Sequence, residues 1–274
     1  MTQPKISIVT ISYNQGEFLK ECLSSVASQI YDNYEHIVVD DGSTDNSRDI
    51  ILSFKNKVIP IFKKNSGPAD SLNKGFEIAK GDIFGYINSD DYLLKNTLKD
   101  VEDLFNKFSG YDVIYGNGYI VDRNSRFKKR MFSKKFSMNN YRLDRYAVCQ
   151  QATFFKKKCY FSVGGFNIEN NRSWDFELFA DMHKKEFKFK KVNNFLGAFR
   201  IYPGSLTGNF ILKDRAVSIF HHKRMYKKYF NTEKNYLDHF LIFFFYVLDR
   251  VFNLKFILRK IYDIYFAYKG KKIN

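Results

Sequence analysis

Residues 5–88 alternate between short apolar runs and amphipathic stretches, and this alternation constrains the fold more than any other feature of the sequence. The apolar runs are rich in β-branched residues and are short enough to be buried strands. They cover residues 5–11, 36–40, 58–62 and 83–87. Between them, apolar residues recur at helical spacing. Strands that alternate with helices predict a parallel sheet with helices on both faces, and therefore an α/β fold.

Polar clusters follow three of these runs, at Ser12–Asn14, Asp40–Asp41 and Asn88–Asp91. Ligands of open α/β sheets bind beyond the carboxyl ends of the strands, so we expect these clusters to meet at one binding edge. Asp90 and Asp91 repel each other unless a cation offsets their charge. Mg²⁺ and Mn²⁺ are held by one or two carboxylates together with substrate phosphates. The acidic pair therefore predicts a divalent metal site, with ordinary turn chemistry as the alternative.

Charge is distributed unevenly along the 274 residues, whose net charge is +16. Residues 1–120 hold 12 Lys and Arg against 17 Asp and Glu, whereas residues 121–274 hold 33 against 12. The basic half predicts an anionic partner: nucleic acid, acidic phospholipid or a substrate that carries pyrophosphate. No nucleic-acid recognition module is recognisable, so nucleic acid is not the expected partner.

The cysteines and the apolar runs bear on the compartment. Cys22, Cys149 and Cys159 show no paired spacing, which argues against a zinc site or a disulfide framework and favours a reducing cytoplasm. A strand begins as early as Lys5, so no signal peptide is expected. The longest apolar run, 240–248, is far shorter than the roughly 20 residues that span a bilayer. We expect a cytoplasmic protein.

After residue 110 the alternation stops. We expect one or two strands in 113–121 and a basic, irregular, mobile loop in 123–145, followed by further short elements and a helical region from 210 to 274. Residues 236–268 mix aromatic and aliphatic side chains with Lys and Arg, a composition that suits a helix in the membrane interface. Anionic lipid would add about 1 kcal/mol per nearby basic residue. Packing on the rest of the chain, or on a second copy in a homo-oligomer, fits the same pattern.

Several ordered motifs resemble glycosyltransferase family 2. They are PKISIVTISYNQGEFLKECLSSVASQIYDNYEHIVVDDGSTDNS, NSGPADSLNKGFEIAKGDIFGYINSDDYL, QQATFFKKKCYFSVGGFN and SWDFELFADM. The resemblance covers about residues 4–208 and implies a GT-A fold, a Rossmann-like, mostly parallel sheet with helices on both faces. It implies a glycosyltransferase domain, 1–208, with a nucleotide-sugar-binding half, 1–110, and an acceptor-binding half, 111–208. A basic, aromatic, helical C-terminal extension, 209–274, would follow.

The resemblance implies an inverting, metal-dependent transfer of a sugar from a nucleoside-diphosphate sugar, with UDP expected, to a hydroxyl of a saccharide or lipid-linked saccharide. Mn²⁺ or Mg²⁺ would be the cofactor. Relatives of this kind build bacterial surface polysaccharides, which would place the protein on the inner face of the cytoplasmic membrane. The alternatives are a nucleic-acid-binding protein that uses the basic half, a nucleotidyltransferase, and a non-catalytic sugar-nucleotide-binding relative. Residues 13–16 do not form the Gly-rich loop that a nucleotidyltransferase would show.

The family's functional positions carry over to particular residues of this sequence. As the resemblance implies, Asp91 would bind the metal and Asp175 would be the general base. The donor would contact Ile11, Tyr13, Asp40, Asp70, Asn73, Asp90 and Arg200. Within this set, Ile11 and Tyr13 would cradle the base, Asp40 would bond the base edge, and Arg200 would contact phosphate.

Structural roles remain as alternatives for the same side chains. Asp175 would also suit the first turn of a helix, and Asp40 would suit a turn cap. Tyr13 would suit the core. Asp70 and Asn73 would suit a solvated helix face.

Two positions depart from the family pattern. Trp174 precedes the expected base where relatives carry an acidic residue, which would alter contacts to the acceptor. Arg200-Ile-Tyr202-Pro-Gly-Ser205 stands where relatives often have Arg-x-His-x-x-Ser, with the His near the diphosphate or metal. Neutral tyrosine is a poor ligand for such a metal, so Tyr202 leaves a His-based third ligand in doubt.

Overall fold

The structure, a computed structural model, describes residues 5–170, 172–205, 215–251, 254–270 and 272–273. Residues 206–214, in which the predicted helical extension begins, lie outside the described residues. The chain forms two compact units. The first comprises residues 1–118 and 148–199, and the second comprises 119–147 and 200–273. Residues 119–147 are thus grouped with the C-terminal helices, whereas the resemblance assigned them to the glycosyltransferase domain.

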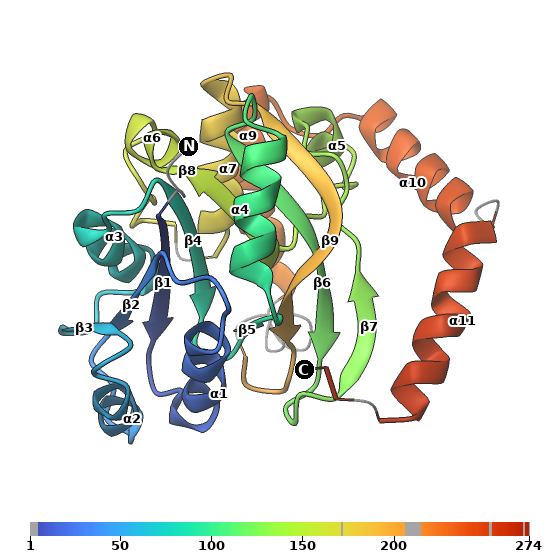
Figure 1. Cartoon of the computed structure of the whole chain (residues 1–274). Coiled ribbons are helices and arrows are strands. Elements are labelled where there is room, and N and C mark those ends of the chain that lie inside the picture. Colours follow the sequence, from blue (N-terminus) through green and yellow to red (C-terminus); the bar gives the residue numbers. More distant parts are fainter. Residues whose placement is uncertain (1–4, 171, 206–214, 252–253, 271, 274) are drawn as a thin grey trace. The chain divides into compact units, whose positions relative to one another are not determined.

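A mixed sheet forms the centre of the first unit (Figure 1). Its strand order is β3-β2-β1-β4-β8-β6-β9-β5. The first four strands are parallel, as the alternation predicted, and the pairs of β8 with β4 and β6 and of β5 with β9 are antiparallel. The strands are β1 (Ile6–Ser12), β2 (Tyr34–Asp40), β3 (Ile59–Phe62), β4 (Ile83–Asn88), β5 (Tyr92–Leu93), β6 (Val113–Val121), β8 (Thr153–Lys156) and β9 (Phe189–Arg200).

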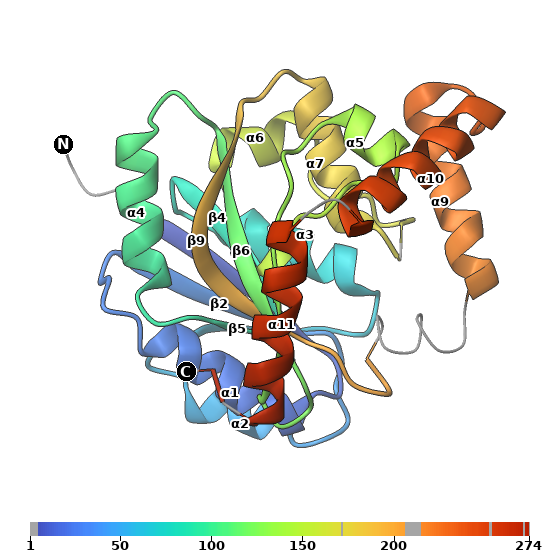
Figure 2. The same cartoon turned by 90° about the vertical axis from the view of Figure 1, so that its right-hand side faces the viewer.

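Helices cover both faces of the parallel strands, as predicted (Figure 2). On one face, helices α1 and α2 pack with Val38 and Val58 in an apolar cluster. On the other face α3 lies so close that a Cβ on Gly75 would stand 2.4 Å from a methyl of Val9 and 3.3 Å from Val39. Val38 and Val39 are consecutive and therefore point to opposite faces of the sheet. The helices are α1 (Gly16–Ala27), α2 (Ser47–Ser53), α3 (Pro68–Ile78), α4 (Thr97–Lys107), α6 (Lys157–Ser162) and α7 (Trp174–Lys184), with a 3₁₀ turn at Gln150–Ala152.

Aromatic rings fill the space between α3, β4 and α6, and they account for part of the high Phe content. The ring of Phe76 lies 4.8 Å from the rings of both Phe84 and Tyr160, and Tyr86 meets Phe166 edge-on at 5.2 Å. Offset and edge-on pairs of this kind stabilise a core beyond the area that they bury. The cluster holds the segment that follows α6 against the sheet.

The second unit contains structure where an irregular loop was expected. The prediction for 123–145 was wrong, because this segment forms β7 and α5. The strand was missed because Lys and Arg interrupt its apolar pattern (Phe-Lys-Lys-Arg-Met). α11 runs alongside β7, where Arg130 pairs with Asp263 at 2.8 Å and lies over the Tyr262 ring (Figure 1). The elements are β7 (Phe127–Met131), α5 (Met138–Arg142), α9 (Arg215–Phe230), α10 (Tyr236–Val251) and α11 (Leu254–Tyr268).

The predicted helical character of the extension is confirmed over the described parts of residues 215–268. Asp238, which is 2% exposed, accepts hydrogen bonds from Arg142 and from the hydroxyl of Tyr226, both at 2.8 Å. This buried carboxylate joins α5, α9 and α10.

Candidate functional site

The carboxyl ends of β1, β2 and β4 meet at one edge of the sheet. Ser12 pairs with Asp40 on one side, and Ile11 pairs with Asn88 on the other. The amide of Asp41 donates to the Ser12 carbonyl at 2.8 Å, and the amide of Ser89 donates to the Ile11 carbonyl at 3.1 Å. The polar clusters singled out in the sequence therefore lie together, at the edge where α/β sheets bind ligands.

Asp40 is 4% exposed, and its two carboxylate oxygens differ. Oδ2 accepts the amide of Ser43 at 3.2 Å, as expected for a turn cap. Oδ1 is buried and has no hydrogen-bond partner among the described residues. A buried carboxylate oxygen without a donor is costly, and such atoms in native proteins usually await a water, an ion or a ligand. Asp40 thus caps a turn with one oxygen and offers the other to a ligand donor.

The loops after β1 and β2 are tied together beside Asp40. Asn14 has a φ of 51°, and its side-chain oxygen accepts a hydrogen bond from the backbone amide of Thr44 at 2.8 Å. The backbone amide of Asn14 donates to Ser43 Oγ at 2.9 Å. Asp45 accepts the amide of Gly16 at 2.9 Å. Tyr13 lies within this loop and is 50% exposed, so it is not a core residue. The bonded loops present its ring at the binding edge.

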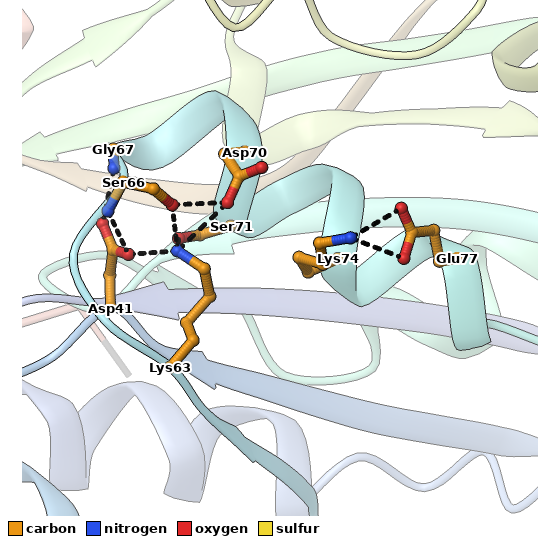
Figure 3. Close-up of polar contacts among 8 residues, drawn as sticks. All are labelled: Asp41, Lys63, Ser66, Gly67, Asp70, Ser71, Lys74 and Glu77. Carbon is orange, nitrogen blue, oxygen red and sulfur yellow. Dashed lines mark hydrogen bonds and ion pairs between the residues drawn. The ribbon is translucent and has the colours of Figure 1, made fainter.

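Asp41 is engaged with the loop that follows β3 (Figure 3). One of its oxygens accepts from the Lys63 ammonium and from the amide of Ser66, and the other accepts the amide of Gly67 at 2.9 Å. Lys63 also pairs with Asp70 at 3.1 Å. The Ser66 hydroxyl and then Lys63 lower the pKa of Asp70, so this carboxylate is held in its charged form.

Asn73 is occupied by protein contacts. Its Nδ2 donates to the Phe166 carbonyl at 2.9 Å, while its Oδ1 accepts the Phe166 amide at 2.9 Å and the Tyr160 hydroxyl at 2.5 Å. These bonds fasten the 160–166 segment to α3. They give Asn73 a structural role, and its predicted contact with a donor stays a prediction.

Asp91 is 1% exposed and is oriented by two amide side chains. Its Oδ2 accepts from Gln151 Nε2 at 2.7 Å and from Asn88 Nδ2 at 3.2 Å. Cys149 lies beside this group and donates to Gln151 Oε1 at 3.6 Å. Burial, together with the Asp91 charge, raises the pKa of Cys149 to about 12, so the thiol stays protonated. Gln151 could not be singled out from the sequence, because a lone glutamine carries no motif.

The residues around Asp91 fit a hard divalent cation. Asn88 Oδ1 is buried and has no partner in the described parts of the chain, and it lies on the residue that already bonds Asp91. Carboxylate and amide oxygens are the ligands that Mg²⁺ and Mn²⁺ prefer. Among the described residues, no group of three or more His, Cys, Asp or Glu side chains could hold a metal by itself. Ions of this kind also take oxygen ligands from water and from substrate phosphates.

Asp175 lies in the first turn of α7 and is half-buried. Its Oδ1 accepts the amide of Phe176 at 2.8 Å, and burial raises the pKa of its carboxyl. The loop before α7 is built around Asn170, which donates to Glu177 and accepts the amide of Ser173 at 3.0 Å. The buried Glu177 thus bonds the start of α7 to the preceding loop, and this bond helps to fix the position of Asp175. Neither Asn170 nor Glu177 was singled out in the sequence.

Arg200 belongs to the second unit and is 1% exposed. Its Nη1 donates to the carbonyls of Asp122 and Arg123 at 3.2 and 2.9 Å, and to Ser125 Oγ at 2.9 Å. These bonds hold the turn between β6 and β7. The predicted contact of Arg200 with phosphate stays a prediction. Tyr202 is 8% exposed and lies under the Arg123 guanidinium.

The last two helices expose apolar side chains. Along α11 four of the exposed apolar residues recur at helical spacing, so these four line one face. α10 exposes a similar set of mainly aromatic residues. None of the helices in the described parts of the chain is both long and apolar enough to cross a membrane. The apolar stripes, as we call them, are Tyr236, Leu237, Phe240, Phe243 and Phe244 on α10 and Ile261, Ile264, Tyr265 and Tyr268 on α11.

Comparison with known proteins identifies a family. Residues 7–163 match the model of Glycosyl transferase family 2. An uncharacterized glycosyltransferase of Rickettsia typhi is 35% identical over 123 residues, a match that covers 44% of this chain and 39% of that relative. The chain thus matches about two fifths of that relative's length.

Two solved structures share the fold. Staphylococcus aureus TarS 1-349 in complex with UDP-GlcNAc has a TM-score of 0.62 at 19% identity, covering 97% of this chain and 81% of that TarS 1-349 chain. The mannosyltransferase PcManGT of Pyrobaculum calidifontis, in complex with GDP-Man and Mn²⁺, has a TM-score of 0.63 at 13% identity, covering 98% and 74%. The predicted GT-A fold is confirmed.

Proposed function

The chain belongs to glycosyl transferase family 2, and we propose that it transfers a sugar from a nucleoside-diphosphate sugar, with UDP as the nucleotide. The acceptor would be a hydroxyl of a saccharide or lipid-linked saccharide in bacterial surface polysaccharide synthesis. The observation that carries the proposal is the buried, unpartnered Asp40 Oδ1 at the binding edge. A carboxylate there suits the imide N–H of uracil, because a charged acceptor strengthens the bond. The exposed ring of Tyr13 suits stacking on the base.

Asp91 would hold Mn²⁺ or Mg²⁺, and Asp90 would lie nearer the ribose or the donor sugar. When bound, such an ion neutralises the charge that develops on the leaving diphosphate. The chain's own part is orientation: Gln151 and Asn88 hold the Asp91 carboxylate in one position. PcManGT, whose structure contains Mn²⁺ and GDP-Man, supports a metal site in this fold.

Asp175 would be the general base. An acceptor hydroxyl is a weak nucleophile at neutral pH, so a positioned carboxylate must take its proton as attack proceeds. Burial raises the pKa of Asp175, which makes its carboxylate a stronger base than an ordinary aspartate. The hydroxyl would attack the anomeric carbon from the face opposite the leaving diphosphate, so the product has inverted configuration.

A donor screen by thermal unfolding tests the proposal. UDP, GDP and dTDP would each be added to the full chain with and without Mn²⁺. We expect UDP with Mn²⁺ to raise Tm most, because it should be the nucleotide that binds most tightly. A ligand at 100 times its Kd stabilises the folded state by about 2.7 kcal/mol. Lack of stabilisation by every nucleotide, with and without metal, would contradict donor binding. A larger shift with GDP or dTDP would reassign the base.

The apolar stripes support a position on the inner face of the cytoplasmic membrane. Exposed aromatic and aliphatic side chains on one helix face suit the boundary between headgroups and acyl chains. Arg259 and Lys260 are exposed at the start of the α11 stripe, and residues 121–274 carry a large excess of basic side chains. Basic residues next to an apolar face favour anionic lipid. We propose that an anionic bilayer surface, where a lipid-linked acceptor would reside, covers the stripes.

Vesicle sedimentation of the full chain tests this placement. We expect retention on vesicles of phosphatidylcholine with phosphatidylglycerol, and little on phosphatidylcholine alone. The Ile264→Ser, Tyr268→Ser double variant should weaken retention roughly tenfold or more, because two exposed apolar side chains that would enter the bilayer are lost. Ile30→Ser is the control, since Ile30 is 61% exposed in the first unit. Equal retention of all three proteins, or a dimer that only the double variant loses, would contradict membrane binding.

A further inference from the structure

Lys63 is held by acidic side chains at the edge of the candidate donor site (Figure 3). Its ammonium contacts the carboxylates of Asp41 and Asp70, the latter at 3.1 Å. The hydroxyls of Ser66 and Ser71 also lie within hydrogen-bonding distance. The side chain of Lys63 is 16% exposed and that of Asp41 is 6% exposed, so this ion pair is shielded from water. Shielded ion pairs are weakened less by salt than ion pairs on the surface.

The Lys63 contacts act on the segment that carries Asp40. The backbone amide of Lys63 donates to the Asp40 carbonyl at 3.1 Å, and its ammonium holds the next side chain, Asp41. Asp41 in turn accepts the amides of Ser66 and Gly67, both at 2.9 Å. The end of β2 is therefore bonded on this side to the loop after β3, as it is on the other side to β1.

The charges explain why a cation is needed here. Asp41 and Asp70 place two carboxylates on one ammonium, and like charges this close repel. Without Lys63, Asp41 and Asp70 would lose the positive charge between them, and the loop that Asp41 binds would lose an anchor. On this side, the segment that bears the unpartnered Asp40 oxygen would then be less firmly held, although its backbone bonds to β1 and to the Lys63 amide remain.

We propose that Lys63 is a positioning residue for nucleotide recognition: it holds Asp41 and the loop after β3 so that Asp40 Oδ1 meets the imide N–H of the donor base. The inference rests on the proposed function, and it adds a residue that acts on the site through Asp41. It predicts that removing the Lys63 charge weakens discrimination at the base N–H more than it weakens binding of the remainder of the nucleotide.

The experiment compares the affinities of the full chain for UDP and for UDP methylated at N3 of the uracil, by titration calorimetry with Mn²⁺. We expect the wild type to prefer UDP about tenfold or more, because methylation leaves the buried Asp40 oxygen without a donor. Asp40→Asn should abolish the preference. Lys63→Met should reduce the preference for UDP to about threefold or less, as expected when most of the hydrogen bond between Asp40 and the base N–H is lost. Lys63→Arg should restore most of it, since the positive charge is kept.

Lys74→Met is the matched control. Lys74 lies on α3, pairs with Glu77 at 3.1 Å, and is well exposed, so its loss should leave the preference unchanged (Figure 3). Lys63→Gln, which keeps a hydrogen-bond donor without the charge, carries the test if Lys63→Met does not fold.

The outcomes separate two failures. A wild type that binds no nucleotide, or that binds both forms of UDP equally, overturns the base contact in the proposed function, and the inference with it. A preference that is lost in Asp40→Asn and retained in Lys63→Met or Lys63→Gln overturns only the role of Lys63. An equal loss of affinity for both ligands in the Lys63 variants also overturns it, since this is what a merely structural role predicts.

Discussion

Asp175→Asn is expected to stop sugar transfer and to leave donor binding intact. An amide has nearly the same shape as the carboxylate but cannot take the acceptor proton, and general base catalysis contributes about 10²- to 10⁴-fold to a rate. We expect kcat to fall by that factor, measured as release of nucleoside diphosphate in the presence of acceptor. The Kd for UDP, measured by calorimetry, should stay within about threefold of wild type, as expected when no donor contact is removed.

Asp181→Asn is the control for this variant, because it removes another acid from the same helix, α7. Its rate should match the wild type. A normal transfer rate in Asp175→Asn would show that another group takes the proton.

The pH dependence of the wild type provides a second measurement on Asp175. The base acts in its ionised form, so kcat/KM should decrease as the pH falls through the pKa of this carboxyl. Burial raises that pKa above the ordinary aspartate value of about 3.9, so the acid limb should lie above that value. A limb at or below the ordinary value would contradict either the burial or the assignment.

Asp91→Asn is expected to remove the metal-dependent part of donor binding and of catalysis. The substitution removes the negative charge that would hold the ion, while Gln151 and Asn88 still place donors beside that position. Metal stabilisation of a leaving group contributes several kcal/mol, so we expect at least about a 100-fold loss of kcat. Independently of activity, the additional rise in Tm that Mn²⁺ gives in the presence of UDP should disappear.

Asp32→Asn is the control for Asp91, because Asp32 is exposed and precedes β2, at the opposite end of that strand from Asp40. It should keep the full Mn²⁺ response. Retention of that response in Asp91→Asn would move the metal site away from the acidic pair.

Much of the first unit could be predicted because its signals are local. The β-branched runs and the helical spacing between them are properties of neighbouring residues, and they indicated the strands β1 to β4 and their parallel order. The segment 123–145 was misjudged because β7 is a basic strand whose apolar residues are few, and its partner α11 lies more than 100 residues away in the chain.

The sequence by itself determined the alternation of strands and helices, and with it the edge at which Asp40, Asn88 and Asp91 would meet. Only the tertiary structure decided which polar atoms the protein uses for itself. Asn73 and Asp41 form hydrogen bonds with residues 93 and 22 positions away in the chain. Asp40 Oδ1, in contrast, is buried without a partner among the described residues. The reason is physical: residue type sets what a side chain can bond, but long-range packing sets which donors reach it.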